Sequence, residues 1–215
     1  MDYILIDLDG TITNPKEGIT KSVQYALSAM NIHIDDLDSL TKHIGPPLRD
    51  GFMEFYGFNE EEAEMAVKKY REYYGERGIH ENELYDGMET LLTKLKQAGK
   101  YLIVATSKPE ELAVKVLKSF HLEHYFDDIC GATFDDSRAS KDAVIKYALE
   151  KNSITNMDRV VMIGDRKYDV LGAKEFGIFS IGVLYGFGSE EELKQAGADR
   201  IAASVEEVYD IVIEL

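Results

Sequence analysis

The chain has 215 residues, enough for one full domain or for a domain that carries a smaller insert. Acidic residues outnumber basic ones by 40 to 24, and the resulting net charge of −16 disfavours binding to nucleic acid or to anionic membranes. No apolar run approaches the length of a membrane span, no basic leader opens the chain, and the single cysteine, Cys130, cannot form an internal disulfide. These features predict a cytoplasmic protein that binds neither nucleic acid nor a membrane.

Short apolar segments alternate along most of the chain with longer helical patterns. The predicted strands are rich in β-branched residues and lie at 3–6, 101–105, 160–163 and 178–183. The predicted helices lie at 88–98, 109–120, 140–151, 167–176 and 190–196, with a last helix after the capping residue Ser204. Near-continuous apolar strands separated by helices indicate an α/β fold, a Rossmann-like, doubly wound parallel sheet with helices on both faces.

The region from residue 15 to residue 81 interrupts this alternation. Its helical patterns lie at 17–30, 36–43, 47–56 and 60–74, and it contains no convincing strand. We therefore expect residues 1–14 and 82–215 to form an α/β core, and residues 15–81 to form a small all-helical cap domain inserted into it. The glycine-rich stretch at 182–188 lacks the spacing of a phosphate-binding loop, and we expect it to be a loop after a strand.

Polar side chains follow three of the predicted strands. Because the carboxyl ends of parallel strands meet at one edge of a sheet, we expect these side chains to lie close together. Each segment alone is a weak signal, whereas all three at strand ends in one chain are hard to attribute to coincidence. A lysine at the start of a later helix, Lys141, is the plausible cation. The three segments are Asp7-Leu8-Asp9-Gly10-Thr11, Thr106-Ser107-Lys108-Pro109 and Gly164-Asp165-Arg166-Lys167-Tyr168-Asp169.

With these motifs the chain resembles the haloacid dehalogenase (HAD) superfamily, on the phosphatase side with a helical cap. The first motif of that superfamily matches residues 6–11, its Thr/Ser motif matches Thr106, and its Gly-Asp-x-x-x-Asp motif matches residues 164–169. Gly45-Pro46-Pro47-Leu48-Arg49 is similar to a cap signature of the phosphoglycolate phosphatase and 5′-nucleotidase-like group.

The lysine motif of the superfamily has more than one candidate residue in this chain. Lys141 has the expected position at a helix start, while Lys146 and Lys108 are weaker competitors.

The resemblance implies an Mg²⁺-dependent phosphomonoester hydrolase that acts on a small phosphorylated metabolite, phosphoglycolate- or nucleotide-like. It implies that Mg²⁺ is bound by the side chains of Asp7 and Asp165 and by the backbone carbonyl of Asp9, with Asp169 assisting directly or through water. Asp7 would attack phosphorus and form an aspartyl-phosphate, and Asp9 would be the general acid and base.

The resemblance also implies the groups that hold the phosphoryl oxygens. Lys141 would contact both Asp7 and a phosphate oxygen, and Thr106 and the Ser107 N–H would bind the phosphoryl group. In the cap, Arg49 is our candidate for a second anionic group of the substrate, with a surface arginine as the equal alternative.

Two rival functions stay open at this point. A β-phosphoglucomutase-like phosphosugar mutase would keep the same core motifs and return the phosphoryl group to its substrate. A non-catalytic binding protein on the same fold is disfavoured, because Asp7, Asp9, Asp165 and a candidate lysine are all present. We expect a monomer or a homodimer.

Overall fold

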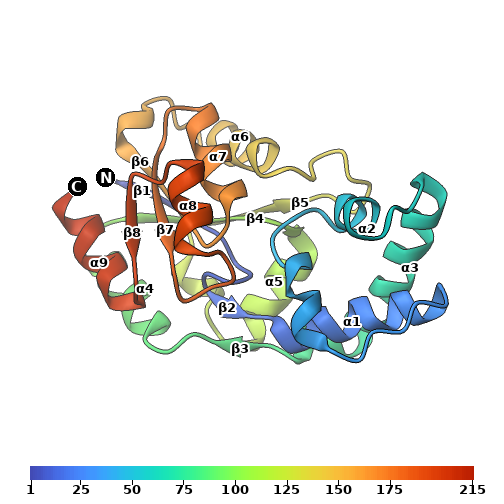
Figure 1. Ribbon diagram of the computed structural model, residues 1–215. Helices are drawn as coiled ribbons and strands as arrows, with labels where there is room; N and C mark the ends of the chain where they lie inside the picture. Colours follow the sequence, from blue (N-terminus) through green and yellow to red (C-terminus); the bar gives the residue numbers. More distant parts are fainter. The chain divides into compact units, whose positions relative to one another are not determined.

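In the computed structural model, which describes residues 1–215, the chain forms two compact units. One combines Met1–Asn14 with Leu84–Leu215, and the other is Pro15–Glu83 (Figure 1). Two-residue strands at the boundary, β2 (Thr13–Asn14) and β3 (Glu83–Leu84), form a small separate sheet. None of the helices is long and apolar enough to cross a membrane.

The first unit contains a six-stranded sheet with the strand order β5-β4-β1-β6-β7-β8, and every neighbouring pair is parallel. This confirms the predicted doubly wound parallel sheet. The four predicted strands are present, and two further strands, β5 and β8, extend the sheet at its two edges. The strands are β1 (Tyr3–Ile6), β4 (Tyr101–Pro109), β5 (Asp128–Ala132), β6 (Val160–Gly164), β7 (Phe179–Val183) and β8 (Arg200–Ala202).

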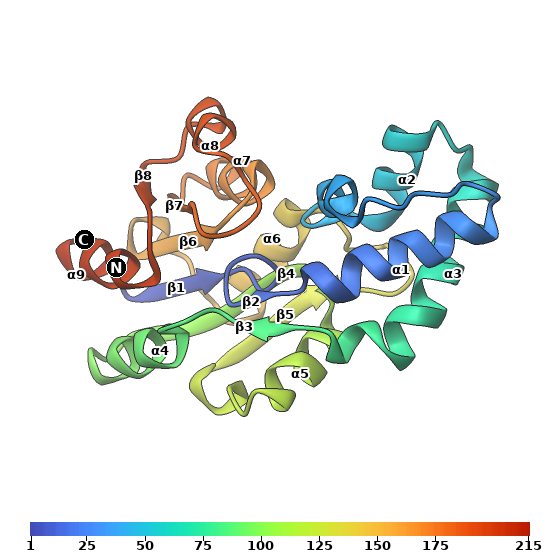
Figure 2. The same ribbon diagram turned by 60° about the horizontal axis from the view of Figure 1, so that its bottom comes forward.

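Helices cover both faces of this sheet (Figures 1 and 2). The helices α6 and α7 pack against β4, β5, β6 and β7 on one face, while α5 and α9 pack on the other, with α4 against α9. The predicted helix at 109–120 begins one residue late, because Pro109 has an extended backbone and belongs to β4. The helices are α4 (Met88–Gln97), α5 (Glu110–Ser119), α6 (Lys141–Lys151), α7 (Lys167–Glu175), α8 (Glu190–Ala196) and α9 (Val205–Glu214).

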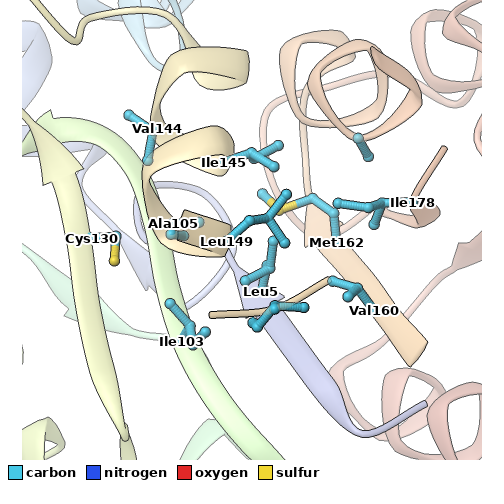
Figure 3. Close-up of a cluster of buried hydrophobic side chains, with 13 residues drawn as sticks. Leu5, Ile103, Ala105, Cys130, Val144, Ile145, Leu149, Val160, Met162 and Ile178 are labelled. Atoms are coloured by element: carbon cyan, nitrogen blue, oxygen red, sulfur yellow. The ribbon is translucent and has the colours of Figure 1, made fainter. Parts of the chain in front are cut away.

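A cluster of fully or nearly fully buried side chains joins the sheet to α6 and α7 (Figure 3). Leu5 from the central strand lies among residues of β4 and β6 and against Ile145 and Leu149 of α6. Side chains along a strand alternate between its faces, so Leu5 points to this cluster while its neighbours Ile4 and Ile6, also buried, serve the other face. This packing fixes α6, and with it the position of its first residue, Lys141.

The register of the central strands determines where the polar motifs emerge. Ile6, the last residue of β1, lies beside Val104 of β4 and Ile163 of β6. The residues that follow these three positions therefore lie at the same level and toward the same edge of the sheet, although β4 itself continues beside β5 to Pro109.

The second unit is helical. Its α-helices are α1 (Lys16–Ala29), α2 (Leu48–Tyr56) and α3 (Glu60–Glu76), and short 3₁₀ helices occupy Leu37–His43 and Gly78–His80. The helix α3 opens with a complete capping box, in which Asn59 and Glu62 each accept a hydrogen bond from the other's backbone N–H. Phe52, Tyr70 and Tyr74 are among its buried side chains.

Candidate active site at the carboxyl edge of the parallel sheet

The turn after β1 places two aspartates at the carboxyl edge of the sheet. The Asp7 N–H donates to the Ile163 carbonyl at 2.9 Å, which continues the β1–β6 ladder by one residue. Gly10 then reverses the chain with a φ of 91°, a backbone conformation that other residues rarely adopt. A side chain at this position would also collide with Asp165, since a Cβ would lie 2.3 Å from its Oδ2 atom. The turn thus needs glycine for both conformation and space.

The segment after β6 supplies two further carboxylates. Asp165 is fully buried, and Asp169, in the first turn of α7, is 2% exposed. The Asp169 Oδ2 atom accepts a hydrogen bond from the Arg166 N–H at 3.0 Å, so this carboxylate caps the helix and faces the strand end. Gly164 permits this approach, because a Cβ there would lie 2.1 Å from the Asp169 carboxyl carbon.

Carboxylate oxygens of Asp7, Asp165 and Asp169 lie within 4.8 Å of one another, and all three residues are buried. The Lys141 ammonium lies 2.8 Å from Oδ1 of Asp7 and 2.8 Å from Oδ1 of Asp169, and it donates a hydrogen bond to the Ala105 carbonyl at 3.0 Å. The structure thus brings together four residues that are far apart in the sequence: Asp7 after β1, Lys141 at the start of α6, and Asp165 and Asp169 after β6.

The Asp9 carboxylate lies outside this cluster. Its Oδ2 atom forms an ion pair with the ammonium of Lys108, which is itself buried. The Lys108 N–H donates to the Thr106 hydroxyl at 3.3 Å, and that hydroxyl keeps a proton to donate elsewhere. Ser107, between them, is only half-buried.

The electrostatics of the site favour an added cation. Four carboxylates and two ammonium groups leave a formal charge of −2 in a buried region. Lys141 contacts Oδ1 of Asp7 and of Asp169, whereas Oδ1 of Asp9 and Oδ1 of Asp165 are buried and have no hydrogen bond. Such oxygens are costly to bury unless something binds them, and they are the ligands that Mg²⁺ prefers. The donor set therefore fits a hard divalent cation.

The pKa shifts describe the same excess of negative charge. Burial, with the negative charges of Asp169 and Asp7, raises the pKa of Asp165 well above its ordinary value. Burial and Asp7 also raise the pKa of Asp169 to about 6, against the opposing effect of Lys141. Burial alone would lower the pKa of Lys141, but Asp169 and Asp7 outweigh burial and raise it, so this lysine stays charged.

A loop whose role the sequence did not predict completes the surroundings of Asp165. The Phe187 N–H donates to Asp165 Oδ2 at 2.7 Å. A Cβ at Gly186 would lie 2.3 Å from the Asp165 Cβ, and one at Gly188 would lie 1.9 Å from the Asp165 carbonyl oxygen. The glycine-rich stretch at 182–188 is therefore in part a loop, as expected, but a loop that packs directly on a site carboxylate. The high density of glycines in this stretch was the sequence feature that could have indicated such close packing.

Arg49 belongs to the helical unit. It lies in the first turn of α2, where a guanidinium nitrogen is 3.4 Å from a Glu60 carboxylate oxygen. Its Nε atom is buried and has no hydrogen bond. A guanidinium has five N–H donors, so most of its binding capacity is not used by Glu60.

Buried carboxylates and lysines at the carboxyl edge of a doubly wound parallel sheet are typical of an α/β enzyme. Comparison with known proteins gives the family. The haloacid dehalogenase-like hydrolase family matches residues 4–183, and the chain belongs to this family. It is an HAD-like phosphatase, as the resemblance of its motifs indicated.

Relatives and solved structures agree with this assignment. A 5′-nucleotidase of Pseudomonas aeruginosa is 45% identical over 89% of the chain and 86% of that protein. A tyrosine-protein kinase, PtkA of Mycobacterium tuberculosis, is 37% identical over 96% of the chain and 71% of that protein. The crystal structure of a predicted phosphatase from Clostridium acetobutylicum has a TM-score of 0.98 and 50% identity, covering 100% of this chain and 99% of the other.

Proposed function

We propose that the protein is an Mg²⁺-dependent phosphomonoester hydrolase that cleaves a small phosphorylated metabolite, phosphoglycolate- or nucleotide-like, through an aspartyl-phosphate on Asp7. The observation that supports this proposal most directly is the buried cluster of Asp7, Asp165 and Asp169 beside Lys141. A nucleophilic carboxylate and a phosphate dianion repel each other, so a site for this reaction must first neutralise charge. The Asp7, Asp165 and Asp169 side chains and the Asp9 carbonyl would hold Mg²⁺, which supplies that neutralisation.

Asp7 is the nucleophile in this proposal because it lies at the strand end, beside the lysine. Its carboxylate would attack phosphorus while the bond from phosphorus to the leaving oxygen breaks. Lys141 orients that carboxylate and offers its positive charge to a phosphoryl oxygen. The Thr106 hydroxyl and the Ser107 N–H would bind the remaining phosphoryl oxygens.

Asp9 would move the protons. Burial raises its pKa, with Lys108 opposing and Asp7 adding to the shift, so the carboxyl group holds a proton more readily than an ordinary aspartate. It would give that proton to the leaving oxygen, and then take one from the water that hydrolyses the aspartyl-phosphate. The 5′-nucleotidase relative supports a metabolite-sized phosphomonoester as substrate.

Arg49 would bind a second anionic group of the substrate, with the helical unit acting as a cap. The buried and unpaired Nε atom and the loose contact with Glu60 support this proposal. A cytosolic location and a monomeric or homodimeric state remain our predictions.

Release of free phosphate tests the function. We expect the wild-type enzyme to release phosphate from small phosphomonoesters with Mg²⁺ present, and to stop when a chelator removes the metal. Asp7→Asn should abolish turnover, whereas Asp35→Asn, at an exposed position in the helical unit, should not change it. Three results would contradict the proposal. They are turnover by Asp7→Asn at the wild-type rate, isomerisation of a phosphosugar with almost no phosphate released, and transfer from ATP to tyrosine in place of hydrolysis.

A further inference from the structure

The ion pair between Lys108 and Asp9 has no part in the mechanism above. Lys108 is the third residue of the segment that follows the predicted strand at 101–105, and its side chain is 5% exposed. Its ammonium contacts Oδ2 of Asp9, while Oδ1 of the same carboxylate is buried without a hydrogen bond. The two carboxylate oxygens of Asp9, the proposed acid and base, therefore have different surroundings. Oδ2 is bound by Lys108, and Oδ1 has no hydrogen bond.

The backbone of β4 brings Lys108 to this place. The pairing of β4 with β5 shifts register between Thr106 and Pro109, so the strand does not continue regularly past the site. The Lys108 N–H bonds to the Thr106 hydroxyl within this irregular stretch. The same stretch thus carries a proposed phosphoryl ligand and the cation that holds Asp9.

A buried lysine needs an explanation, because its burial costs both hydration and side-chain freedom. A general need for positive charge in the site does not explain why Lys108 contacts Asp9 in particular. Lys141 already lies 2.8 Å from Asp7 and from Asp169, so the lysine beside the nucleophile is Lys141. Lys108 contacts the one site carboxylate that does not belong to the metal-binding cluster.

We propose that Lys108 is a positioning residue for Asp9: by holding Oδ2 it presents Oδ1 to the reacting oxygens. In the first step the proton leaves Oδ1 for the leaving oxygen. The bond from that oxygen to phosphorus breaks with its electron pair staying on the oxygen, as the bond from Asp7 to phosphorus forms. In the second step Oδ1 takes a proton from water, the water oxygen bonds to phosphorus, and the bond to Asp7 breaks. This inference rests on the proposed function of Asp9.

Leaving-group dependence tests the inference. Lys108→Met shortens the unbranched side chain by one atom and removes its charge. An alkyl phosphate needs a proton on its leaving oxygen, whereas p-nitrophenolate leaves without one. The value of kcat/KM covers the steps up to departure of the leaving group. We expect it to fall ~10–100-fold for an alkyl phosphate, within the usual contribution of acid–base catalysis, and less than ~3-fold for p-nitrophenyl phosphate. The Mg²⁺-dependent rise in unfolding temperature should be that of the wild type.

Two further variants keep the result interpretable. Lys118→Met, at an exposed position on α5, should change neither substrate. Asp9→Asn combined with Lys108→Met removes both partners of the buried pair, and so avoids leaving one charge alone. We expect this double variant to have the same alkyl-to-aryl ratio as Asp9→Asn, because Lys108 has nothing left to position.

The inference is overturned if Lys108→Met slows both substrates equally, or if the double variant loses much more of the alkyl-to-aryl ratio than Asp9→Asn does. If Lys108→Met does not fold, Lys108→Gln, which also removes the charge, takes its place in both measurements. Failure of the proposed function has a different signature, since the wild-type enzyme would then release phosphate from neither substrate.

Discussion

Substitution of Gly186 by alanine should separate metal binding from folding. The added Cβ would lie 2.3 Å from the Asp165 Cβ and 2.4 Å from the Gly10 carbonyl oxygen, much closer than a van der Waals contact. Neither neighbour is the end of a flexible side chain, so the backbone of the loop or of the Asp7–Gly10 turn must move. Overpacking of this kind typically costs about 1–3 kcal/mol. Because Asp165 is a proposed metal ligand and Gly10 directly follows Asp9, whose carbonyl is another, we expect Gly186→Ala to remove most of the Mg²⁺ effect and of the activity.

The assay is chemical unfolding with and without saturating Mg²⁺. For the wild type, free metal at about 100 times its dissociation constant should stabilise the fold by about 2.7 kcal/mol. For Gly186→Ala this increment should nearly vanish. Gly75→Ala is the matched control, because Gly75 lies in α3 with no atom within 4 Å of an added Cβ. It should gain up to about 1 kcal/mol from helix propensity and keep the full Mg²⁺ increment. A Gly186→Ala variant that binds Mg²⁺ and turns over like the wild type would refute the role given to this loop.

Two further predictions concern single side chains. The pKa of Asp169, raised by burial and by Asp7 against Lys141 to about 6, means that the folded state keeps a proton which the unfolded chain loses near 3.8. Its contribution to stability is therefore complete below about pH 4 and lost by about pH 6. In metal-free urea titrations the stability of the wild type relative to Asp169→Asn should fall over that range, and the part of the raised Asp165 pKa that comes from Asp169 acts in the same direction. A constant difference would contradict this. His43, whose pKa burial lowers to about 4, titrates in both proteins and cancels. Cys130 is buried and burial raises the pKa of its thiol to about 12, so a disulfide reagent should label it only after unfolding, and rapid labelling of the native protein would contradict that burial.

The sequence predicted the centre of the sheet better than its edges, for a physical reason. The central strands are buried on both faces and form continuous apolar runs, such as Val160–Ile163. The edge strand β5 begins with Asp128 and contains Gly131, and β8 begins with an exposed Arg200. Edge strands have fewer neighbours and can keep polar residues, so their composition resembles that of a loop.

In the site, too, some residues could be placed from the sequence and others could not. Asp7, Asp165, Asp169 and Lys141 could be brought together in prediction because parallel strands share a carboxyl edge and because the start of a helix is visible in the sequence. The position of Lys108 could not be predicted, because it depends on a register shift inside β4 that no local sequence pattern indicates. That shift gives the site two lysines with separate partners, Lys141 for Asp7 and Asp169 and Lys108 for Asp9. In a chain with a net charge of −16, two buried lysines and a bound divalent cation would confine the positive charge to the place where a phosphate dianion must bind. The acidic exterior would then exclude larger polyanions, while a small phosphomonoester that reaches this edge of the sheet meets a neutralised site.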